Sequence, residues 1–288
     1  MTRPDDRKHA REIAEILRIG RAASALVLEI YATPFTVDLK GPDDPVTQAD
    51  RQANALICRE LEASFPGDAI LAEESVPDDP AAIAALAARP RVFFVDPLDG
   101  TREFADRNGE FAVMIGLAVG GRAALGVLVL PTTGEALVGW APDEEDEAGG
   151  GAFMEAFDGA RRPLRVSSVS DPAQAAAMVS RSHPHPATRA LLDHLAIARV
   201  VPCGSVGVKV ARVATSAADL YVHTGVGAKR WDTCAPEAVL RGAGGRFTDA
   251  RGEPIDYASA DLVLRDGIVA TNAALHGAVI AAARAALS

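Results

Sequence analysis

Cysteine is scarce in this chain of 288 residues, and its three copies lie far apart and form no CxxC pair. Such a set, Cys58, Cys203 and Cys234, argues against a disulfide framework or a zinc site and favours a reducing cytoplasm. Long apolar runs are also missing. The longest, residues 111–119, is too short for a transmembrane helix, and the charged first 13 residues contain no apolar signal core.

Blocks of Lys and Arg are absent as well, and the formal net charge is −10. This balance argues against nucleic acid or an anionic membrane as the main partner. A small phosphorylated substrate remains compatible with this charge, because bound metal ions reverse the local sign of a site.

Aromatic residues make up only 5% of the chain, so its core must consist mainly of Ala, Val, Leu and Ile. The length suffices for one large domain or two closely packed ones.

The apolar pattern predicts an N-terminal α+β half and a C-terminal α/β half, over residues 1–158 and 159–288. Helical spacing predicts helices at about 7–30, 46–61 and 79–88. Apolar runs predict strands at 69–72, 92–95, 111–119, 123–130 and 135–140, with a polar loop at 40–45. Short strands alternate with helices from residue 164 onward, so we expect the boundary between Glu155 and Pro163.

A compact set of oxygen-bearing residues follows the buried strand at 92–95, in the segment Asp96-Pro97-Leu98-Asp99-Gly100-Thr101. Pro97 lacks an N–H and cannot continue the strand ladder, and Gly100 permits a tight turn. Carboxylates, a turn carbonyl and a hydroxyl on a stiff turn suit a hard cation such as Mg²⁺. The alternative is an ordinary capped turn, because Asp, Pro, Gly and Thr are common turn residues.

Further carboxylates occupy similar positions in the chain. Glu73 follows the short strand at 69–72, and Asp232 stands at a helix start. If these groups and Asp96 and Asp99 converge on one cleft, like-charge repulsion raises their pKa values unless cations lie between them. Two or three Mg²⁺ ions would relieve the repulsion, activate water and stabilise the leaving oxygen of a phosphate ester.

A haloacid-dehalogenase-type phosphatase is a competing interpretation, because that class carries an Asp-x-Asp-Gly-Thr signature with a nucleophilic first aspartate. The two aspartates of that signature are two residues apart, so both point from one face of an extended segment. Here Asp96 and Asp99 are three apart with a proline between them, and the motif is mid-chain. This spacing fits metal ligation better than a covalent phospho-aspartate.

Three ordered motifs together resemble the lithium-sensitive, magnesium-dependent phosphatase superfamily. They are Glu73-Glu74-Ser75, Asp96 to Thr101, and Trp231-Asp232-Thr233-Cys234-Ala235. The superfamily includes inositol monophosphatases, fructose-1,6-bisphosphatases and 3′(2′),5′-bisphosphate nucleotidases. The chain is most similar to the nucleotidases, through Thr101-Arg102-Glu103-Phe104, Ser180-Arg181-Ser182-His183 and Lys229 to Glu237. The resemblance covers nearly the whole chain and implies a layered α/β/α/β/α sandwich.

The resemblance also implies residue roles. The metal ligands would be the side chains of Glu73, Asp96, Asp99 and Asp232 and the carbonyl of Leu98. The proton of the attacking water would be shared by Asp50 and Thr101. The nucleotide would be held by Ser180, His183, Ser205 and Lys209. Plainer roles stay open: His183 as a loop histidine, Lys209 as a surface charge, and Asp50 as an early-helix carboxylate favoured by the dipole. Ser205 stands where some relatives carry glycine.

The implied reaction is hydrolysis of adenosine 3′,5′-bisphosphate to AMP and phosphate, by in-line attack of a metal-bound water without a phospho-enzyme. Within the superfamily, the alternative is an inositol monophosphatase or a sugar bisphosphate phosphatase. From another class, the alternative is a catalytically silent metabolite-binding protein, although such a relative would be expected to have lost a ligand or Thr101. We expect a cytoplasmic protein without a transmembrane segment, and a homodimer is compatible with the resemblance.

Overall fold

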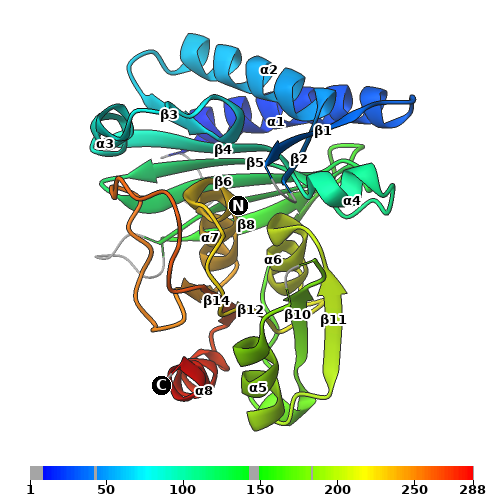
Figure 1. Cartoon of the computed structure of the whole chain (residues 1–288), viewed down its shortest axis with the longest axis vertical. Helices are drawn as coiled ribbons and strands as arrows, with labels where there is room; N and C mark the ends of the chain where they lie inside the picture. The colour runs from blue at the N-terminus through cyan, green and yellow to red at the C-terminus, as the bar shows by residue number, and fades with distance from the viewer. Residues whose placement is uncertain (1–8, 42–43, 143–148, 183, 288) are drawn as a thin grey trace.

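The computed structural model describes residues 9–41, 44–142, 149–182 and 184–287. Five layers stack in the order helix, sheet, helix, sheet, helix (Figure 1). The outer layers are the pair α1 (Ala10–Tyr31) and α2 (Gln48–Ser64) and the pair α5 (Pro186–His194) and α8 (His276–Leu287). The middle layer holds α6 (Val206–Ala214) and α7 (Cys234–Gly242). The predicted layered α/β/α/β/α sandwich is therefore confirmed.

The larger sheet has seven strands in sequence order, β3-β4-β5-β6-β7-β8-β9. They are β3 (Ala69–Ala72), β4 (Arg91–Asp99), β5 (Ala112–Val119), β6 (Arg122–Leu130), β7 (Glu135–Trp140), β8 (Gly151–Glu155) and β9 (Arg161–Pro163). β3 and β4 are parallel, and every later neighbour is antiparallel. The parallel pair brings the end of β3 beside the end of β4, which places Glu73 next to the segment that begins at Asp96.

The smaller sheet has five strands in the order β11-β10-β12-β14-β13. They are β10 (Ala176–Ser180), β11 (Arg199–Cys203), β12 (Leu220–His223), β13 (Gly245–Thr248) and β14 (Ile268–Asn272). β10 pairs in parallel with both β11 and β12, so the carboxyl ends of these three strands meet at one edge. This edge carries Ser180, Cys203 and His223.

The helices of the first layer are amphipathic. In α1 the buried positions include Ile13, Ile16, Leu17 and Ala23, at the spacing that places side chains on one helix face. These residues pack with α2 on one face of the larger sheet. Among the described helices, none combines the length and the apolar content that crossing a membrane requires.

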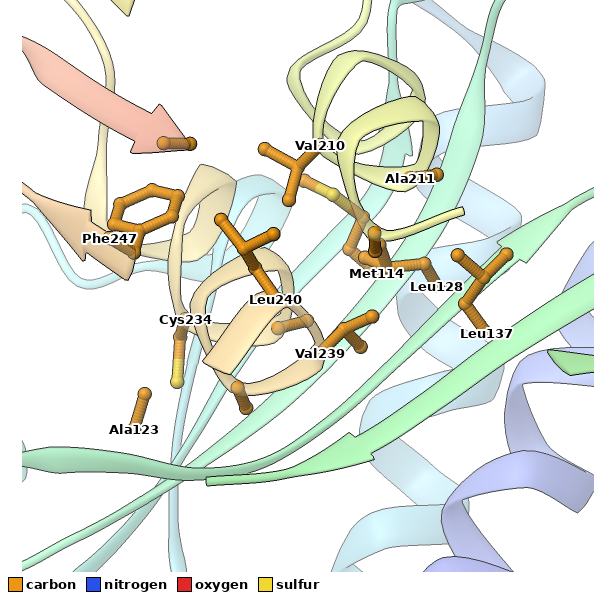
Figure 2. Packing of buried hydrophobic residues seen from close by; sticks show 14 of the residues in the cluster. Met114, Ala123, Leu128, Leu137, Val210, Ala211, Cys234, Val239, Leu240 and Phe247 are labelled. Carbon is orange, nitrogen blue, oxygen red and sulfur yellow. The ribbon is translucent and has the colours of Figure 1, made fainter. Parts of the chain in front are cut away.

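Glycines on the larger sheet allow α7 to lie unusually close to it. A Cβ atom on Gly126 of β6 would lie 2.3 Å from Ala235 O, and one on Gly139 of β7 would lie 2.4 Å from Val239 Cα. The remaining space of the middle layer is filled by apolar side chains of both helices and the sheet (Figure 2). This packing fixes the short helix η4 (Arg230–Asp232), which precedes α7 and carries Asp232.

Several local features differ from the sequence prediction. The predicted loop at 40–45 overlaps a hairpin of β1 (Val37–Gly41) and β2 (Asp44–Thr47), and β8 and β9 were not predicted. β4 does not stop before Asp96 but continues to Asp99, with a shift in register between these two residues. The irregularity accommodates Pro97, which cannot donate to the ladder. β9 still belongs to the larger sheet, and the division at residues 158/159 stays a proposal.

Candidate active site

The end of β4 and the turn after it position three of the predicted site residues. Gly100 adopts φ 97°, and a Cβ atom there would lie 2.8 Å from Glu110 O, so this turn excludes larger residues. The turn leads into the short helix α4 (Thr101–Ala105). Asp96 and Asp99 are buried, and Leu98 N donates to Asp96 Oδ1 at 3.0 Å.

Asp50 and Thr101 form a hydrogen-bonded pair across two elements. Thr101 Oγ1 donates to Asp50 Oδ1 at 2.8 Å and also lies 3.1 Å from Leu98 O. The other carboxylate oxygen of Asp50 accepts from Thr47 N at 2.7 Å and Thr47 Oγ1 at 2.6 Å, which completes a capping box at the start of α2. The helix cap therefore holds Oδ2 of Asp50, while Oδ1 accepts the hydrogen bond from Thr101.

Ser205 lies beneath Asp99. Its hydroxyl donates to Asp99 Oδ2 at 2.5 Å, and Gly207 N donates to the same oxygen at 2.6 Å. Ser205 is completely buried, and Val208 N donates to its Oγ as the N-cap bond of α6. In this structure the hydroxyl of Ser205 thus positions Asp99 and caps the helix, and its substrate contact stays a prediction.

Asp232 and Glu73 approach the same region from other elements. Asp232 Oδ2 accepts from Lys229 N at 2.7 Å. Glu73 begins the short helix η2 (Glu73–Ser75), where Lys40 Nζ lies 2.8 Å from Glu73 Oε1 and 2.6 Å from Glu74 Oε1. Lys40 extends from the β1–β2 hairpin, so an ammonium group currently compensates the two glutamates.

Electrostatics link the carboxylates of the site. Burial raises the pKa of Asp96 and of Asp232 well above the ordinary value, and in each case neighbouring carboxylates add to the effect. Burial also raises the pKa of Asp99, and it raises that of Glu73 to about 7 against the opposing charge of Lys40. In the described part of the chain, no ion pair joins Asp96, Asp99 or Asp232 to a cationic side chain.

The donor set of the site has the chemistry of a hard-cation site. Buried carboxylate oxygens that repel one another are the ligands that Mg²⁺ prefers, and a bound cation offsets their repulsion. Among the described residues, however, no three or more His, Cys, Asp or Glu side chains already form a group that holds an ion. The fit to Mg²⁺ therefore rests on the chemistry of the donors, which are carboxylate oxygens with raised pKa values.

A cavity of about 290 Å³ adjoins these residues. Its lining includes Asp99, Thr101 and Asp232 together with Ser180 and Lys209. Lys209 is only 1% exposed, and its ammonium donates to Gly204 O at 2.7 Å and Cys203 O at 3.2 Å. It also lies over the ring of Tyr221, 4.9 Å from the centroid. Lys209 is thus a buried group and not a surface charge.

The structure brings together the predicted residues that it describes, and His183 lies outside the described residues. It also adds lining residues to which the sequence assigned no role: Arg102, Glu103, Ser182, Tyr221 and His223. Ser182 and His223 follow from strand ends, since β10 and β12 finish at this edge. Lys40 was missed because a lysine in an exposed hairpin carries no local signal of its partner.

Comparison with known proteins identifies relatives over the full length of this architecture. The model of the inositol monophosphatase family matches residues 9–288. The 3′(2′),5′-bisphosphate nucleotidase CysQ of Escherichia coli K12 is 32% identical over 255 residues, which is 88% of this chain and 96% of that protein. Human 3′(2′),5′-bisphosphate nucleotidase 1 is 28% identical over 278 residues, covering 86% and 85% of the two chains.

Solved structures agree. The crystal structure of CysQ from Bacteroides thetaiotaomicron superimposes with a TM-score of 0.73 at 26% identity, covering 91% of this chain and 97% of that one. The extragenic suppressor protein suhB from Bartonella henselae gives a TM-score of 0.76 at 26% identity, covering 94% and 97%. The predicted resemblance is confirmed: the chain belongs to the inositol monophosphatase family.

Proposed function

We propose that this protein is a Mg²⁺-dependent phosphomonoesterase that hydrolyses adenosine 3′,5′-bisphosphate to AMP and phosphate. The observation that carries the proposal is the Thr101–Asp50 hydrogen bond of 2.8 Å beside Asp99 and Asp232, which line the cavity. The names of the relatives support the nucleotide substrate. We place the enzyme in the cytoplasm, in line with its scarce cysteines, and leave a homodimer as part of the proposal.

Asp50 and Thr101 supply the base of the reaction. Because Thr101 Oγ1 donates its proton to Asp50 Oδ1, its lone pairs are free to accept a proton from a water at the cavity end. Asp50 in turn takes the hydroxyl proton. Burial raises the pKa of Asp50 above its ordinary value, which makes it a better proton acceptor than an exposed aspartate. Its cap bonds from Thr47 hold the carboxylate in this orientation.

The family is metal-dependent, typically with Mg²⁺. In our proposal two or three ions are held by Glu73, Asp96, Asp99, Asp232 and the carbonyl of Leu98. When bound, Mg²⁺ neutralises phosphate charge and lowers the pKa of water. Ser205 and Gly207 N keep Asp99 oriented for this task. The occupied site would take the phosphate at the Asp99–Asp232 end of the cavity.

The remaining part of the cavity would bind the nucleoside. Ser180 lines it, and Lys209 contributes a buried positive charge whose two carbonyl contacts leave one ammonium proton for a substrate oxygen. We assign His183 to the same part on the basis of the motif that it shares with the nucleotidases. Of the proposed halves, residues 1–158 would carry most of the metal ligands, and residues 159–288 would carry the substrate contacts and the last ligand, Asp232.

A substrate panel tests this function. Phosphate release is measured with Mg²⁺ from adenosine 3′,5′-bisphosphate, inositol 1-phosphate and fructose 1,6-bisphosphate. We expect the highest kcat/KM with the nucleotide and loss of about two to four orders of magnitude in the Asp99→Asn variant. Preference for inositol 1-phosphate or the sugar bisphosphate would reassign the substrate. Full activity in chelator would refute the metal requirement.

A further inference from the structure

Glu103 occupies a position in the cavity that the proposed reaction does not yet use. It lies in α4, two residues after Thr101, and its side chain lines the cavity although the residue is only 3% exposed. The next residue, Phe104, anchors the helix in the core. Its ring packs against Tyr31, Phe35 and Phe111 with centroids 4.7–5.2 Å apart. Glu103 is therefore held rigidly near the reacting end.

Among the described residues, the side-chain donors near the Glu103 carboxylate are distant, and its nearer donor is its own backbone N–H. Ser182 Oγ donates to Oε1 at a long 3.4 Å, and Arg181 Nη1 lies 3.9 Å away. Arg181 makes its closer ion pair, 2.7 Å, with Glu110. Burial raises the pKa of Glu103 above its ordinary value. A buried carboxylate with unfilled acceptor positions at a cavity gains free energy from any hydrogen-bond donor that a ligand brings.

Gly204 makes this placement possible from the opposite side. A Cβ atom on Gly204 would lie 1.7 Å from the Glu103 carboxyl carbon, so the carboxylate rests directly on the glycine backbone. Gly204 O in turn accepts from Lys209. The cavity wall thus presents a carboxylate beside a buried ammonium, an arrangement that suits a neutral polar group and disfavours a second phosphate at the carboxylate itself.

The chemistry of the substrate indicates which donor this is. If the scissile phosphate binds beside Asp99 and Asp232, the sugar is the part of the substrate directly attached to it. Adenosine 3′,5′-bisphosphate keeps one free ribose hydroxyl, at C2′, next to the carbon that carries the 3′-phosphate. This hydroxyl is the neutral donor nearest to the reacting phosphorus, and Glu103 is an anchored acceptor close to Thr101.

We propose that Glu103 accepts a hydrogen bond from the ribose hydroxyl adjacent to the scissile phosphate, and so selects ribonucleotides over 2′-deoxyribonucleotides. This inference rests on the proposed nucleotidase function. A deoxy substrate would leave the buried carboxylate without its donor, and sites built to hydrogen-bond a hydroxyl discriminate strongly against analogues that lack it. Glu103 is thus a specificity-determining residue, distinct from the Asp50–Thr101 base.

The test compares kcat/KM for adenosine 3′,5′-bisphosphate and its 2′-deoxy analogue. We expect the wild-type enzyme to prefer the ribose form by about 10- to 100-fold, the size of a hydrogen bond to a charged group. In Glu103→Leu the preference should fall to within about threefold, because both substrates then lack the acceptor. Glu103→Gln keeps the shape and one acceptor oxygen, and should fall between the two enzymes.

Glu110→Gln is the matched control. Glu110 belongs to the same charged cluster, through Arg181 and Gly204 N, but does not line the cavity. The Glu110→Gln variant should retain the ribose preference, and thermal melting should show that all variants are folded.

Inosine 3′,5′-bisphosphate tests the alternative that Glu103 contacts the base. If Glu103→Leu alters the preference for adenine over hypoxanthine and leaves the ribose preference unchanged, Glu103 contacts the base and the proposal is wrong.

The possible outcomes distinguish a failure of the Glu103 assignment from a failure of the proposed nucleotidase function. Equal kcat/KM for ribose and deoxyribose substrates in an active wild-type enzyme would overturn the role of Glu103 and leave the nucleotidase function intact. The same holds if folded Glu103→Leu and Glu103→Gln both keep the full ribose preference. A wild-type enzyme that hydrolyses neither bisphosphate, but does hydrolyse inositol 1-phosphate, would overturn both.

Discussion

At the residue scale, the site depends on the hydroxyl of Thr101, whose position is set by three elements of the fold. Thr101 begins α4, donates to Asp50 in α2 and lies near the carbonyl of Leu98 in β4. Gly100 makes this possible through its positive φ. The hydroxyl is therefore fixed before substrate binds, which is the condition for efficient proton transfer.

Replacing this hydroxyl gives a sharp prediction. Thr101→Val keeps the shape of the side chain but removes the proton relay to Asp50, so kcat should fall by about 10²- to 10⁴-fold. Thr101→Ser restores the hydroxyl and should stay within about tenfold of wild type. Steady-state kinetics with saturating Mg²⁺ measure both variants. Equal losses in Val and Ser would show that the methyl group matters and the relay does not.

At the element scale, the close approach of α7 to the larger sheet decides where Asp232 lies. Glycines on β5, β6 and β7 leave room for the backbone of α7. The short helix η4 directly precedes α7 in the chain, so the position of α7 also sets the position of η4. Any side chain inserted here pushes the helix outward and moves Asp232 away from β4. The packing of the middle layer (Figure 2) therefore helps to set the position of Asp232.

Gly126→Ala tests this link. Its Cβ would lie 2.3 Å from Ala235 O, and such overpacking typically costs about 1–3 kcal/mol in the free energy of unfolding. Urea unfolding measures the loss, and isothermal titration should show weaker Mg²⁺ binding. Gly277→Ala in α8 is the matched control, because nothing lies within 4 Å of its Cβ; it should be neutral or slightly stabilising. Wild-type stability and Mg²⁺ affinity in Gly126→Ala would contradict the link.

At the scale of the whole molecule, the carboxylates that serve function oppose stability. Burial raises the folded-state pKa values of Glu73, Asp96, Asp99 and Asp232 above their ordinary values, Glu73 to about 7. Between the unfolded and folded pKa values the native state binds more protons than the unfolded state. The metal-free protein should therefore lose stability as pH rises through that window.

Magnesium should reverse this trend, because it compensates the charges that protons compensate at low pH. We expect Mg²⁺ to raise the melting temperature more at pH 8 than at pH 5, with one ion at about 100 times its Kd adding ~2.7 kcal/mol. Differential scanning fluorimetry at constant ionic strength, with NaCl as control, measures the shift. Asp99→Asn should reduce it, whereas a shift independent of pH would argue against linked carboxylates.

Local patterns in the sequence determined much of this protein. The apolar run before Asp96 predicted β4, and helical spacing predicted α1 and α2. Three ordered acidic motifs predicted the family, which the comparisons confirm. These features depend on contacts within a few residues, so periodicity and motif spacing contain them.

The tertiary structure alone decided which of these residues meet. Ser205 lies beneath Asp99, Lys40 pairs with Glu73, and the Glu103 carboxylate rests on Gly204, each across a large separation in the chain. The strand β1 is exposed along most of its length and so lacks the buried alternation that would have revealed it. Such contacts follow from how layers pack against one another, and packing between distant segments leaves no period in the sequence of either one.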